Sequence, residues 1–583
     1  MCGIIGHCNF RGERLSRSLF LEALELMNHR GPDGEGLLEK DDQLIGHVRL
    51  SIIDLDGGAQ PIERDNHIIT FNGEIYNYRE LRIRLEKLGV KFTTHSDTEV
   101  ILAGYLHFGS KFFQSLIGMY AFAIHHPDGS VLLHRDQTGQ KPLYYFKDSN
   151  RLVYSSVLGS LIHIVGKQNL NIDAILLYFY LSYIPSPYCI YENINKLAAG
   201  ELITIEASGR LSSTVISTIG NQQCTIEDII KHSTVSDTPI GLSLSAGIDS
   251  SVILNSVHPR ISKAYTVKSR GLNNNNDEWR YALRFAKELK VDHQLISSDE
   301  LNLDSINRIQ NKMDEPFGDS SILMADLVAK QAKIDGIKVI LTGDGADEFF
   351  SGYRKHRALY FMSLIYRIPR LVRMIVSLLM PNKKMRKILS LSENLSEAYI
   401  MSLNMGIENS DLKDEAIKII SKEWDIFNSS FLDCLRYDRA IVLEGDMMVK
   451  SDRIYMQHGI ESRPVFALNI MQEYINKFSV GELISYREMK LPLKKFASDL
   501  PKYILNRKKT GFESPLDKIS PEEMNKEIRG LIEKVLTSSK ISNYELIMNC
   551  FYMGLASSSA REKYIVYALS IWIKNNKDQI KWS

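Results

Sequence analysis

Two parts of the sequence carry residues whose types and spacing could do chemistry. The first is the N-terminus, where Cys2 follows the initiator Met1 and precedes the small residue Gly3. Removal of Met1 would leave a free α-amine beside the thiol, and this amine can act as the local base for a thiolate nucleophile. A single cysteine is weak evidence, because most are small buried hydrophobic residues.

The second part is the run LSAGIDSS at residues 244–251, where a predicted strand gives way to a predicted helix. Small residues let the backbone approach phosphate oxygens, and the helix N-terminus adds N–H donors and a positive dipole. The run is not a Walker A motif, which would need Gly-Lys-Ser/Thr. It indicates a pyrophosphate-binding loop, with a helix cap rich in Ser and Gly as the alternative.

Five short motifs mark the first hundred residues. In order they are MCGIIG at 1–6, HRGPD at 29–33, RLSIID at 49–54, FNGEIYN at 71–77 and SDTE at 96–99. Together they resemble the N-terminal-nucleophile glutaminase domain of class II glutamine amidotransferases. Several spaced motifs in one order are more specific than any one of them.

This resemblance implies the roles that a glutaminase needs. Cys2 would attack the side-chain amide of glutamine, and the Asn72 amide with the backbone N–H of Gly73 would stabilise the oxyanion that forms. The guanidinium of Arg49 would hold the α-carboxylate of glutamine through two hydrogen bonds. The other residues expected to bind glutamine are Ile53, Asn72, Glu74 and Asp97.

Residues 244–251 resemble the SGGxDS loop of ATP pyrophosphatases, with Ala246 in place of the middle glycine. Further motifs resemble the synthetase domain of the glutamine-hydrolysing asparagine synthetases. They are DEPF at 314–317, DSS at 319–321, TGDGADE at 342–348, SGY at 351–353, KSDR at 450–453, ESR at 461–463, KLPL at 490–493 and NRKKTGF at 506–512. The resemblance runs from Cys2 to about residue 515.

The reaction implied is attack of a carboxylate, that of aspartate, on the α-phosphate of ATP, after which ammonia displaces AMP. Attack of one anion on another needs cations, so Mg²⁺ on the triphosphate is expected. The residues expected to bind ATP are Leu244, Ser245, Gly247, Asp249, Ser250, Val267, Thr342 and Gly343. Asp344, Tyr353 and Lys490 would be catalytic. Asp249 and Asp347 would bind the metal, although acids at a helix N-terminus are the alternative. The resemblance also implies an internal channel for ammonia.

Two stretches depart from the family pattern, QTGQ at 137–140 and PVFAL at 464–468, where the family continues Pro-Phe-Leu-Asp. The second leaves the acceptor open, and the same chemistry could amidate another carboxylate, such as a uronic-acid sugar in surface-polysaccharide biosynthesis. Near-zero net charge and a complete glutaminase count against an enzyme that modifies nucleic acid. Intact catalytic residues count against an inactive scaffold.

The elements that position these residues differ between the two halves. Short strands with turns and a few helices fill the first 200 residues, and the resemblance predicts an αββα sandwich there. Strands then alternate with helices, which predicts a doubly wound parallel sheet (α/β), and the last 200 residues read as helical. We therefore expect two domains, residues 2–218 and 219–583.

Composition excludes several classes of protein. The 71 Lys and Arg balance 70 Asp and Glu, for a net charge of +1, so no nucleic-acid partner is expected. The six cysteines form no CxxC pair, which indicates neither a zinc site nor a disulfide framework. The most apolar run, residues 371–380, is too short to span a membrane. It predicts an amphipathic helix packed on its own domain rather than one that contacts a membrane. A cytoplasmic protein is expected, with a homodimer suggested by the resemblance.

Overall fold

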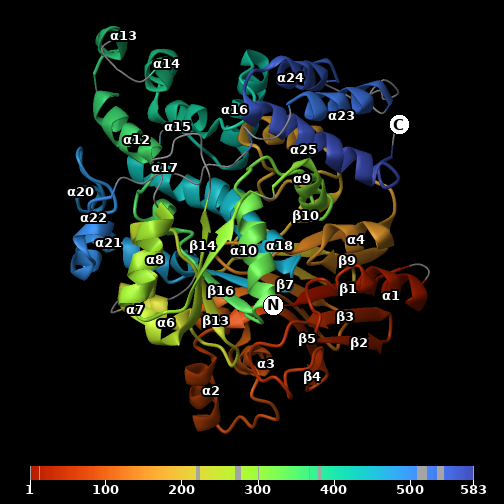
Figure 1. Cartoon of the computed structure of the whole chain (residues 1–583). Coiled ribbons are helices and arrows are strands. Elements are labelled where there is room, and N and C mark those ends of the chain that lie inside the picture. The colour runs from red at the N-terminus through yellow and green to blue at the C-terminus, as the bar shows by residue number, and fades with distance from the viewer. Residues whose placement is uncertain are drawn as a thin grey trace.

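The computed structural model describes residues 2–11, 14–217, 224–268, 278–299, 301–366, 368–378, 383–427, 429–507, 516, 521–534 and 544–581. The predicted boundary after residue 218 and motif residues 508–512 lie outside these ranges. The architecture has two parts, as predicted, and the strands within the described ranges form three sheets (Figure 1).

Two six-stranded antiparallel sheets form the N-terminal part. The first has the order β10 (Ile194–Lys196), β8 (Tyr144–Lys147), β9 (Arg151–Ser155), β1 (Gly3–Asn9), β3 (Gln43–Arg49) and β2 (Gly34–Lys40). The second has the order β12 (Leu211–Val215), β11 (Glu201–Ile205), β7 (Val131–Arg135), β6 (Gly118–His125), β5 (His67–Ile75) and β4 (Ile62–Arg64).

The two sheets bury alternate residues of their strands against each other. Ile4 and Cys8 of β1 share one apolar cluster with Ala121 and Ala123 of β6, as the two-residue period of a strand requires. Helices α1 (Arg17–Glu25) and α4 (Leu158–Val165) cover the first sheet, and α3 (Asp97–Phe108), next to α2 (Tyr78–Lys87), covers the second. The predicted αββα sandwich is confirmed.

The third sheet is parallel and carries the C-terminal part. Its order is β15 (His293–Ser297), β14 (Ile261–Lys268), β13 (Ile240–Ser243), β16 (Val339–Thr342) and β17 (Glu461–Pro464). Neighbouring residues of β14 face opposite sides, since Tyr265 packs with α10 (Ile322–Ile334) and α18 (Val449–Met456), whereas Ala264 belongs to the main core. Helices on both faces confirm the doubly wound sheet. Other helices of this part of the chain are α6 (Ile226–His232), α7 (Ile248–Val257), α8 (Glu278–Glu288), α9 (Leu303–Gln310) and α11 (Ala346–Phe349).

Helices make up most of the remaining C-terminal part. They are α12 (Arg354–Ile365), α13 (Arg370–Leu378), α14 (Lys383–Leu391), α15 (Leu395–Leu403), α16 (Ser410–Glu423), α17 (Phe431–Asp438), a π-helical segment (Arg439–Met448), α19 (Met471–Ile475), α20 (Val480–Leu483), α21 (Leu491–Phe496), α22 (Lys502–Leu505), α23 (Pro521–Lys534), α24 (Tyr544–Ala556) and α25 (Ala560–Asn576). Among the described residues, no helix is both long and apolar enough to cross a bilayer. All six cysteines are free thiols.

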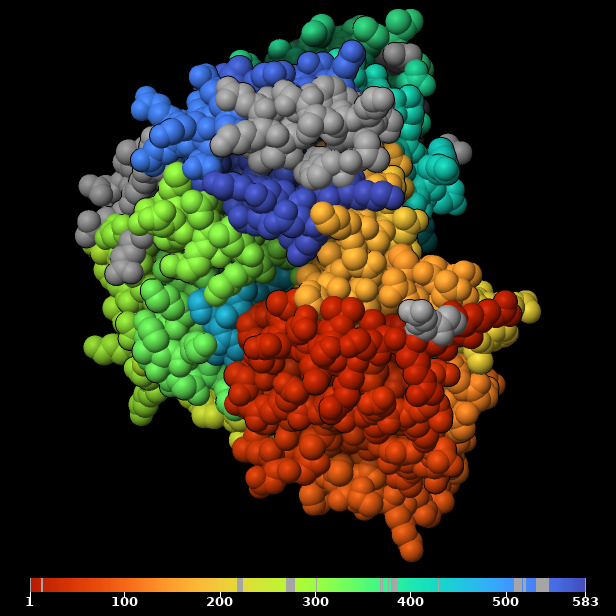
Figure 2. All heavy atoms as spheres, turned by 90° about the vertical axis from the view of Figure 1, so that its right-hand side faces the viewer, coloured from red at the N-terminus to blue at the C-terminus, as the bar shows by residue number. Residues whose placement is uncertain are grey.

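The two parts interlock through α5 (Ile172–Leu181), which packs on α16 and α24 of the C-terminal part. The hydroxyl of Tyr178 donates to the carbonyl of Ile565 at 2.7 Å. Figure 2 shows orange residues at the surface between the red N-terminal residues and the blue C-terminal residues. Helix α13 forms where the sequence predicts a helix. The expectation that its apolar side packs on its own domain is wrong, because Leu371 and Ile375 are 78 % and 63 % exposed.

Candidate active sites

Cys2 directly precedes β1, and it contacts Asn72 on β5 of the facing sheet. The backbone N–H of Cys2 donates to Asn72 Oδ1 at 3.2 Å. The Asn72 amide nitrogen donates in turn to the hydroxyl of Ser156, 3.4 Å away, which orients the amide. Cys2 is buried, and burial raises the pKa of its thiol. Gly73 follows directly, and a Cβ there would lie 2.1 Å from the carbonyl oxygen of Met119, so only glycine fits.

Arg49 and Ile53 are also in contact, through a hydrogen bond from the side chain of Arg49 to the backbone of Ile53. The guanidinium of Arg49 donates to the carbonyls of Ile53 at 3.2 Å and Leu55 at 3.0 Å, which fixes the end of β3 against the following loop. Both residues lie in the N-terminal part with Cys2, and their binding of glutamine stays a prediction.

Glu74 and Asp97 are two buried carboxyl groups beside this region. Asp97 Oδ2 accepts the backbone N–H of Ile75 at 2.9 Å. Burial raises the pKa of Asp97 to about 6, although backbone hydrogen bonds oppose the shift. Burial, reinforced by the charges of Glu461 and Asp97, raises the pKa of Glu74 well above its ordinary value. Glu461 lies on β17, so the C-terminal part contributes to the surroundings of this site.

The loop after β13 is held by its own hydroxyl groups. The backbone N–H of Ser245 donates to Ser250 Oγ at 3.2 Å, and that of Gly247 donates to Ser245 Oγ at 3.4 Å. Ala246 has a φ of 52°, which glycine adopts without steric penalty and which alanine adopts here with some strain. Alanine therefore holds a backbone conformation at this position that favours glycine. Leu244 is fixed to β14 by a 2.8 Å hydrogen bond to the carbonyl of Tyr265, two residues before Val267.

Lys490 joins the two predicted metal ligands. Its Nζ lies 2.6 Å from Asp249 Oδ1 and 2.7 Å from Asp347 Oδ1. Burial alone would lower the pKa of Lys490, but the two carboxylates outweigh it and raise the pKa. A Cβ on Gly352 would lie 2.0 Å from both Asp347 Oδ1 and Lys490 Cε, so this glycine makes room for the ion pair.

Asp344 lies in the loop after β16, against the LSAGIDSS loop. Its carboxylate accepts the hydroxyl of Thr342 at 2.8 Å and that of Ser451 at 2.9 Å. A Cβ on Gly343 would lie 3.0 Å from Asp249 Cβ, so the two loops are in close contact. The predicted ATP-binding residues therefore gather at the carboxyl ends of β13, β14 and β16, where open parallel sheets bind ligands.

Tyr353 donates its hydroxyl to Glu348 Oε1 at 2.6 Å. Burial, followed by the charge of Asp347, raises the pKa of Glu348 to about 7, although the Tyr353 hydrogen bond lowers it. The sequence does not single out Glu348 as catalytic, because the TGDGADE motif does not distinguish this carboxyl group from its neighbours.

Asp249 and Asp347 fit a metal held jointly with phosphate. Among the described residues, no three or more His, Cys, Asp or Glu side chains converge as a metal site. Mg²⁺ is commonly held by one or two carboxylates with substrate phosphates and water. Two carboxylates that converge on one cation, Lys490, match that pattern.

Helix α18 connects the two sites, which sequence reasoning did not predict. Ser451 contacts Asp344, and the next residue, Asp452, accepts the guanidinium of Arg30 at 2.8 Å and 3.1 Å. Arg30 Nε donates to the backbone carbonyl of Cys2 at 3.1 Å. No spacing rule could have paired these residues, because Arg30 and Asp452 are 422 positions apart.

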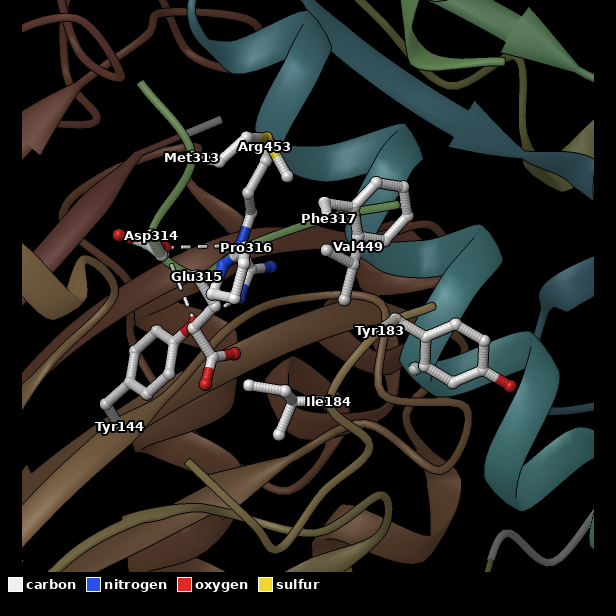
Figure 3. Close-up of a pocket in the computed structure, with 11 residues that line it drawn as sticks. Tyr144, Tyr183, Ile184, Met313, Asp314, Glu315, Pro316, Phe317, Val449 and Arg453 are labelled. Carbon is white, nitrogen blue, oxygen red and sulfur yellow. Dashed lines mark hydrogen bonds and ion pairs between the residues drawn. The ribbon is translucent and has the colours of Figure 1, made fainter. Parts of the chain in front are cut away.

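A cavity of about 10 Å³ lies beside α18, about the room that one water needs (Figure 3). Val449 and Arg453 line it from α18, and Tyr144 lines it from β8 of the N-terminal part. Arg453 donates to the hydroxyl of Tyr144 at 3.1 Å and pairs with Asp314 at 3.3 Å. The cavity is thus lined by both charged and apolar side chains and lies between the two parts of the chain.

The two stretches that depart from the family pattern contact each other. The hydroxyl of Thr138 donates to the carbonyl of Ala467 at 2.7 Å, and the amide of Gln140 donates to the same carbonyl at 2.9 Å. Residues 464–468 are buried and contribute to the interface between the two parts. The stretches at 137–140 and 464–468, which both depart from the family pattern, therefore contact each other through these hydrogen bonds.

Comparison with known proteins agrees with this geometry. A glutamine amidotransferase domain model matches residues 1–214, and an asparagine synthase model matches residues 223–574. Glutamine-hydrolysing asparagine synthetase 1 of Bacillus subtilis is 30 % identical over 98 % of this chain and 96 % of its own. Putative glutamine-hydrolysing asparagine synthetase 2 of Methanocaldococcus jannaschii is 33 % identical over 75 % of this chain and 91 % of its own. A solved glutamine phosphoribosylpyrophosphate amidotransferase of B. subtilis covers 50 % of this chain and 65 % of its own at a TM-score of 0.29, too low to add to the assignment. The chain belongs to the asparagine synthase family, as a glutamine-hydrolysing, ATP-dependent ligase.

Proposed function

We propose that this enzyme makes asparagine from aspartate, ATP and glutamine, with glutamate, AMP and pyrophosphate as the other products. The observation that carries the proposal is that helix α18 contacts both candidate sites. Ser451 of α18 contacts Asp344, and the next residue, Asp452, contacts Arg30. A ligase that uses the ammonia released at Cys2 needs its two sites fixed relative to each other.

Glutamine would be hydrolysed in the N-terminal part. The Cys2 thiolate attacks the side-chain amide, and Asn72 and the N–H of Gly73 stabilise the oxyanion. Arg49, Ile53, Glu74 and Asp97 hold the amino-acid end of the substrate. Water then releases glutamate from the thioester. The ammonia moves inward, with the cavity beside Val449 and Arg453 as one section of its route.

Acyl transfer would occur in the C-terminal part. Ser245, Gly247 and Ser250 hold the pyrophosphate, with Leu244, Val267, Thr342 and Gly343 around the rest of ATP. Mg²⁺, bound by Asp249 and Asp347 with the phosphates, would neutralise charge on the triphosphate. Lys490 stabilises the anion that develops on the acyl-adenylate, and Asp344 with Tyr353 positions the reacting groups. We propose residues 2–218 and 219–583 as the two domains, a cytoplasmic location, and a homodimer.

The test follows pyrophosphate, AMP and amide product with ATP, Mg²⁺ and glutamine across a panel of acceptors: aspartate, other amino acids and hexuronic acids. We expect asparagine with aspartate alone. In Cys2→Ala, glutamine should no longer support the reaction, whereas ammonium should still do so. Turnover with a uronic acid but not with aspartate would show that the acceptor is a uronic acid. Glutamine use by Cys2→Ala equal to that of the unmodified enzyme would refute Cys2 as the nucleophile.

A further inference from the structure

One helix presents its apolar side to solvent. On α13 the residues Leu371, Met374, Ile375 and Leu378 are 78 %, 49 %, 63 % and 68 % exposed. We call these four side chains the α13 face. Their spacing of i, i+3, i+4 and i+7 places them on one side of the helix, the pattern that normally faces a core.

The polar side of α13 faces inward instead. Arg373 is buried, donates to the carbonyl of Glu393 at 3.1 Å and lies over the ring of Tyr366 at 4.5 Å. Ser377 is also buried. The orientation of the helix is therefore set by specific contacts, which turn its apolar side outward. Figure 1 places α13 and α14 at the edge of the helical region, away from the N-terminal sheets.

The segment around this face is strongly basic. Residues 370–392, which include α13 and α14, contain six Lys and Arg and no Asp or Glu, in a chain whose net charge is +1. On α14, which packs against α13, Lys383, Arg386 and Lys387 are exposed, and Lys387 pairs with the exposed Glu408. Apolar side chains next to exposed basic ones suit a helix that lies in the surface of an anionic membrane.

We propose that the α13 face docks on an anionic lipid bilayer as a peripheral contact. The nine-residue helix would be about 14 Å long, too short to span the hydrocarbon core but long enough to lie along the headgroups. A second copy of the chain fits less well, because a symmetric contact would bring two basic segments together. Anionic headgroups complement the charge while the bilayer interface buries the apolar side chains.

The test is flotation of the full chain with vesicles of phosphatidylcholine alone or with 30 % phosphatidylglycerol. We expect at least tenfold more protein bound to the anionic vesicles, and most of it released by 0.5 M NaCl. Ile375→Glu should lower this binding at least tenfold. The matched control is Ile83→Glu, which makes the same change at a 53 % exposed isoleucine on α2 and should bind within twofold of the unmodified chain.

Three results would overturn the proposal. The first is no binding to anionic vesicles at millimolar lipid, and the second is an equal loss of vesicle binding in Ile375→Glu and Ile83→Glu. The third is a dimer that forms without lipid and that Ile375→Glu dissociates, which would make the α13 face a self-association surface. Ile375 lies outside both candidate active sites, so the glutaminase rate of Ile375→Glu should be unchanged. An unchanged rate shows that the variant is folded. Because lipid binding is measured without substrates, its failure is independent of the proposed function.

Discussion

Arg30 and Asp452 form a buried ion pair with two hydrogen bonds, and the same guanidinium holds the backbone carbonyl of Cys2. Burial would raise the pKa of Asp452, but Arg30 and Lys141 together hold it well below its ordinary value. The pair therefore stays ionised. It couples the position of the nucleophile to a helix whose preceding residue contacts Asp344.

Asp452→Asn removes the charge that Arg30 faces. We expect a loss of about 3–5 kcal/mol in the free energy of unfolding, because Arg30 then stays buried without its ionic partner. Displacement of Cys2 should lower glutamine hydrolysis by up to about a hundredfold. The control Asp42→Asn breaks the exposed Arg14–Asp42 pair, which should matter by less than about 1 kcal/mol. Urea unfolding measures the stability of both variants, and a glutaminase assay measures their glutamine hydrolysis. Equal stability and equal hydrolysis in Asp452→Asn and Asp42→Asn would refute the coupling between α18 and Cys2.

Lys490→Met leaves Asp249 and Asp347 without the cation between them. Asparagine formation should fall by about a thousandfold, since a preorganised positive charge is lost from the site where negative charge develops during ammonia attack on the acyl-adenylate. Glutamine hydrolysis should stay within twofold. Lys494→Met, one turn later and exposed beside Glu488, is the control and should leave both activities unchanged. A comparable fall in the control would mean that Lys490 acts through folding.

Glu348→Gln should change how stability depends on pH. The Glu348 pKa of about 7 exceeds its ordinary value of 4.5, so between these values the folded chain holds a proton that the unfolded chain has released. The free energy of unfolding of the unmodified enzyme should therefore fall as the pH rises from about 4.5 to about 7, by up to about 3 kcal/mol relative to Glu348→Gln. Urea unfolding at pH 5 and pH 8 measures this. Parallel pH profiles of the two proteins would contradict it.

The contact between the divergent stretches should support the synthetase site. A Cβ on Gly345 would lie 2.7 Å from the nitrogen of Ala467, so movement of Ala467 must disturb the loop that contains Asp344. The double change Thr138→Val with Gln140→Leu removes both donors to the Ala467 carbonyl and should destabilise the enzyme by about 1–3 kcal/mol. Pyrophosphate formation should fall while glutamine hydrolysis persists.

The control for this contact is Thr138→Ser, which keeps the hydroxyl and should retain activity. If the double variant instead keeps full synthesis but accepts a different carboxylate, the stretch at 464–468 acts on the acceptor and not on the interface.

Much of the fold followed from local pattern. Residues 244–251 read as a strand-to-helix loop because small residues follow a short apolar run, and β13 and α7 lie there. Strand β17 lies in the region that reads as helical, because its four residues are all buried and two of them are Glu461 and Arg463, a buried ion pair that hides any apolar pattern. Charge pairing within the strand thus overrode the signal used to find strands.

Only some of the contacts in the candidate sites could likewise be predicted from the sequence. Motif resemblance grouped Cys2 with Asn72 and Asp249 with Lys490, and the structure brings each pair into contact. It could not find the Arg30–Asp452 pair or the outward side of α13, because both depend on which distant surfaces meet. The periodicity of residues 371–378 indicates an apolar stripe, but only the packing of Arg373 on Tyr366 determines that the stripe faces outward.

The central claim is that nitrogen passes inside the protein from Cys2 to the acyl-adenylate. The most direct test supplies glutamine labelled with ¹⁵N in its amide, together with aspartate, ATP, Mg²⁺ and a tenfold excess of unlabelled ammonium. Mass spectrometry of the product gives the source of its nitrogen. The account predicts that most asparagine carries ¹⁵N while ammonium is in excess. Asparagine labelled only in proportion to the mixed ammonia pool would show that the nitrogen passes through solvent, and would contradict the account.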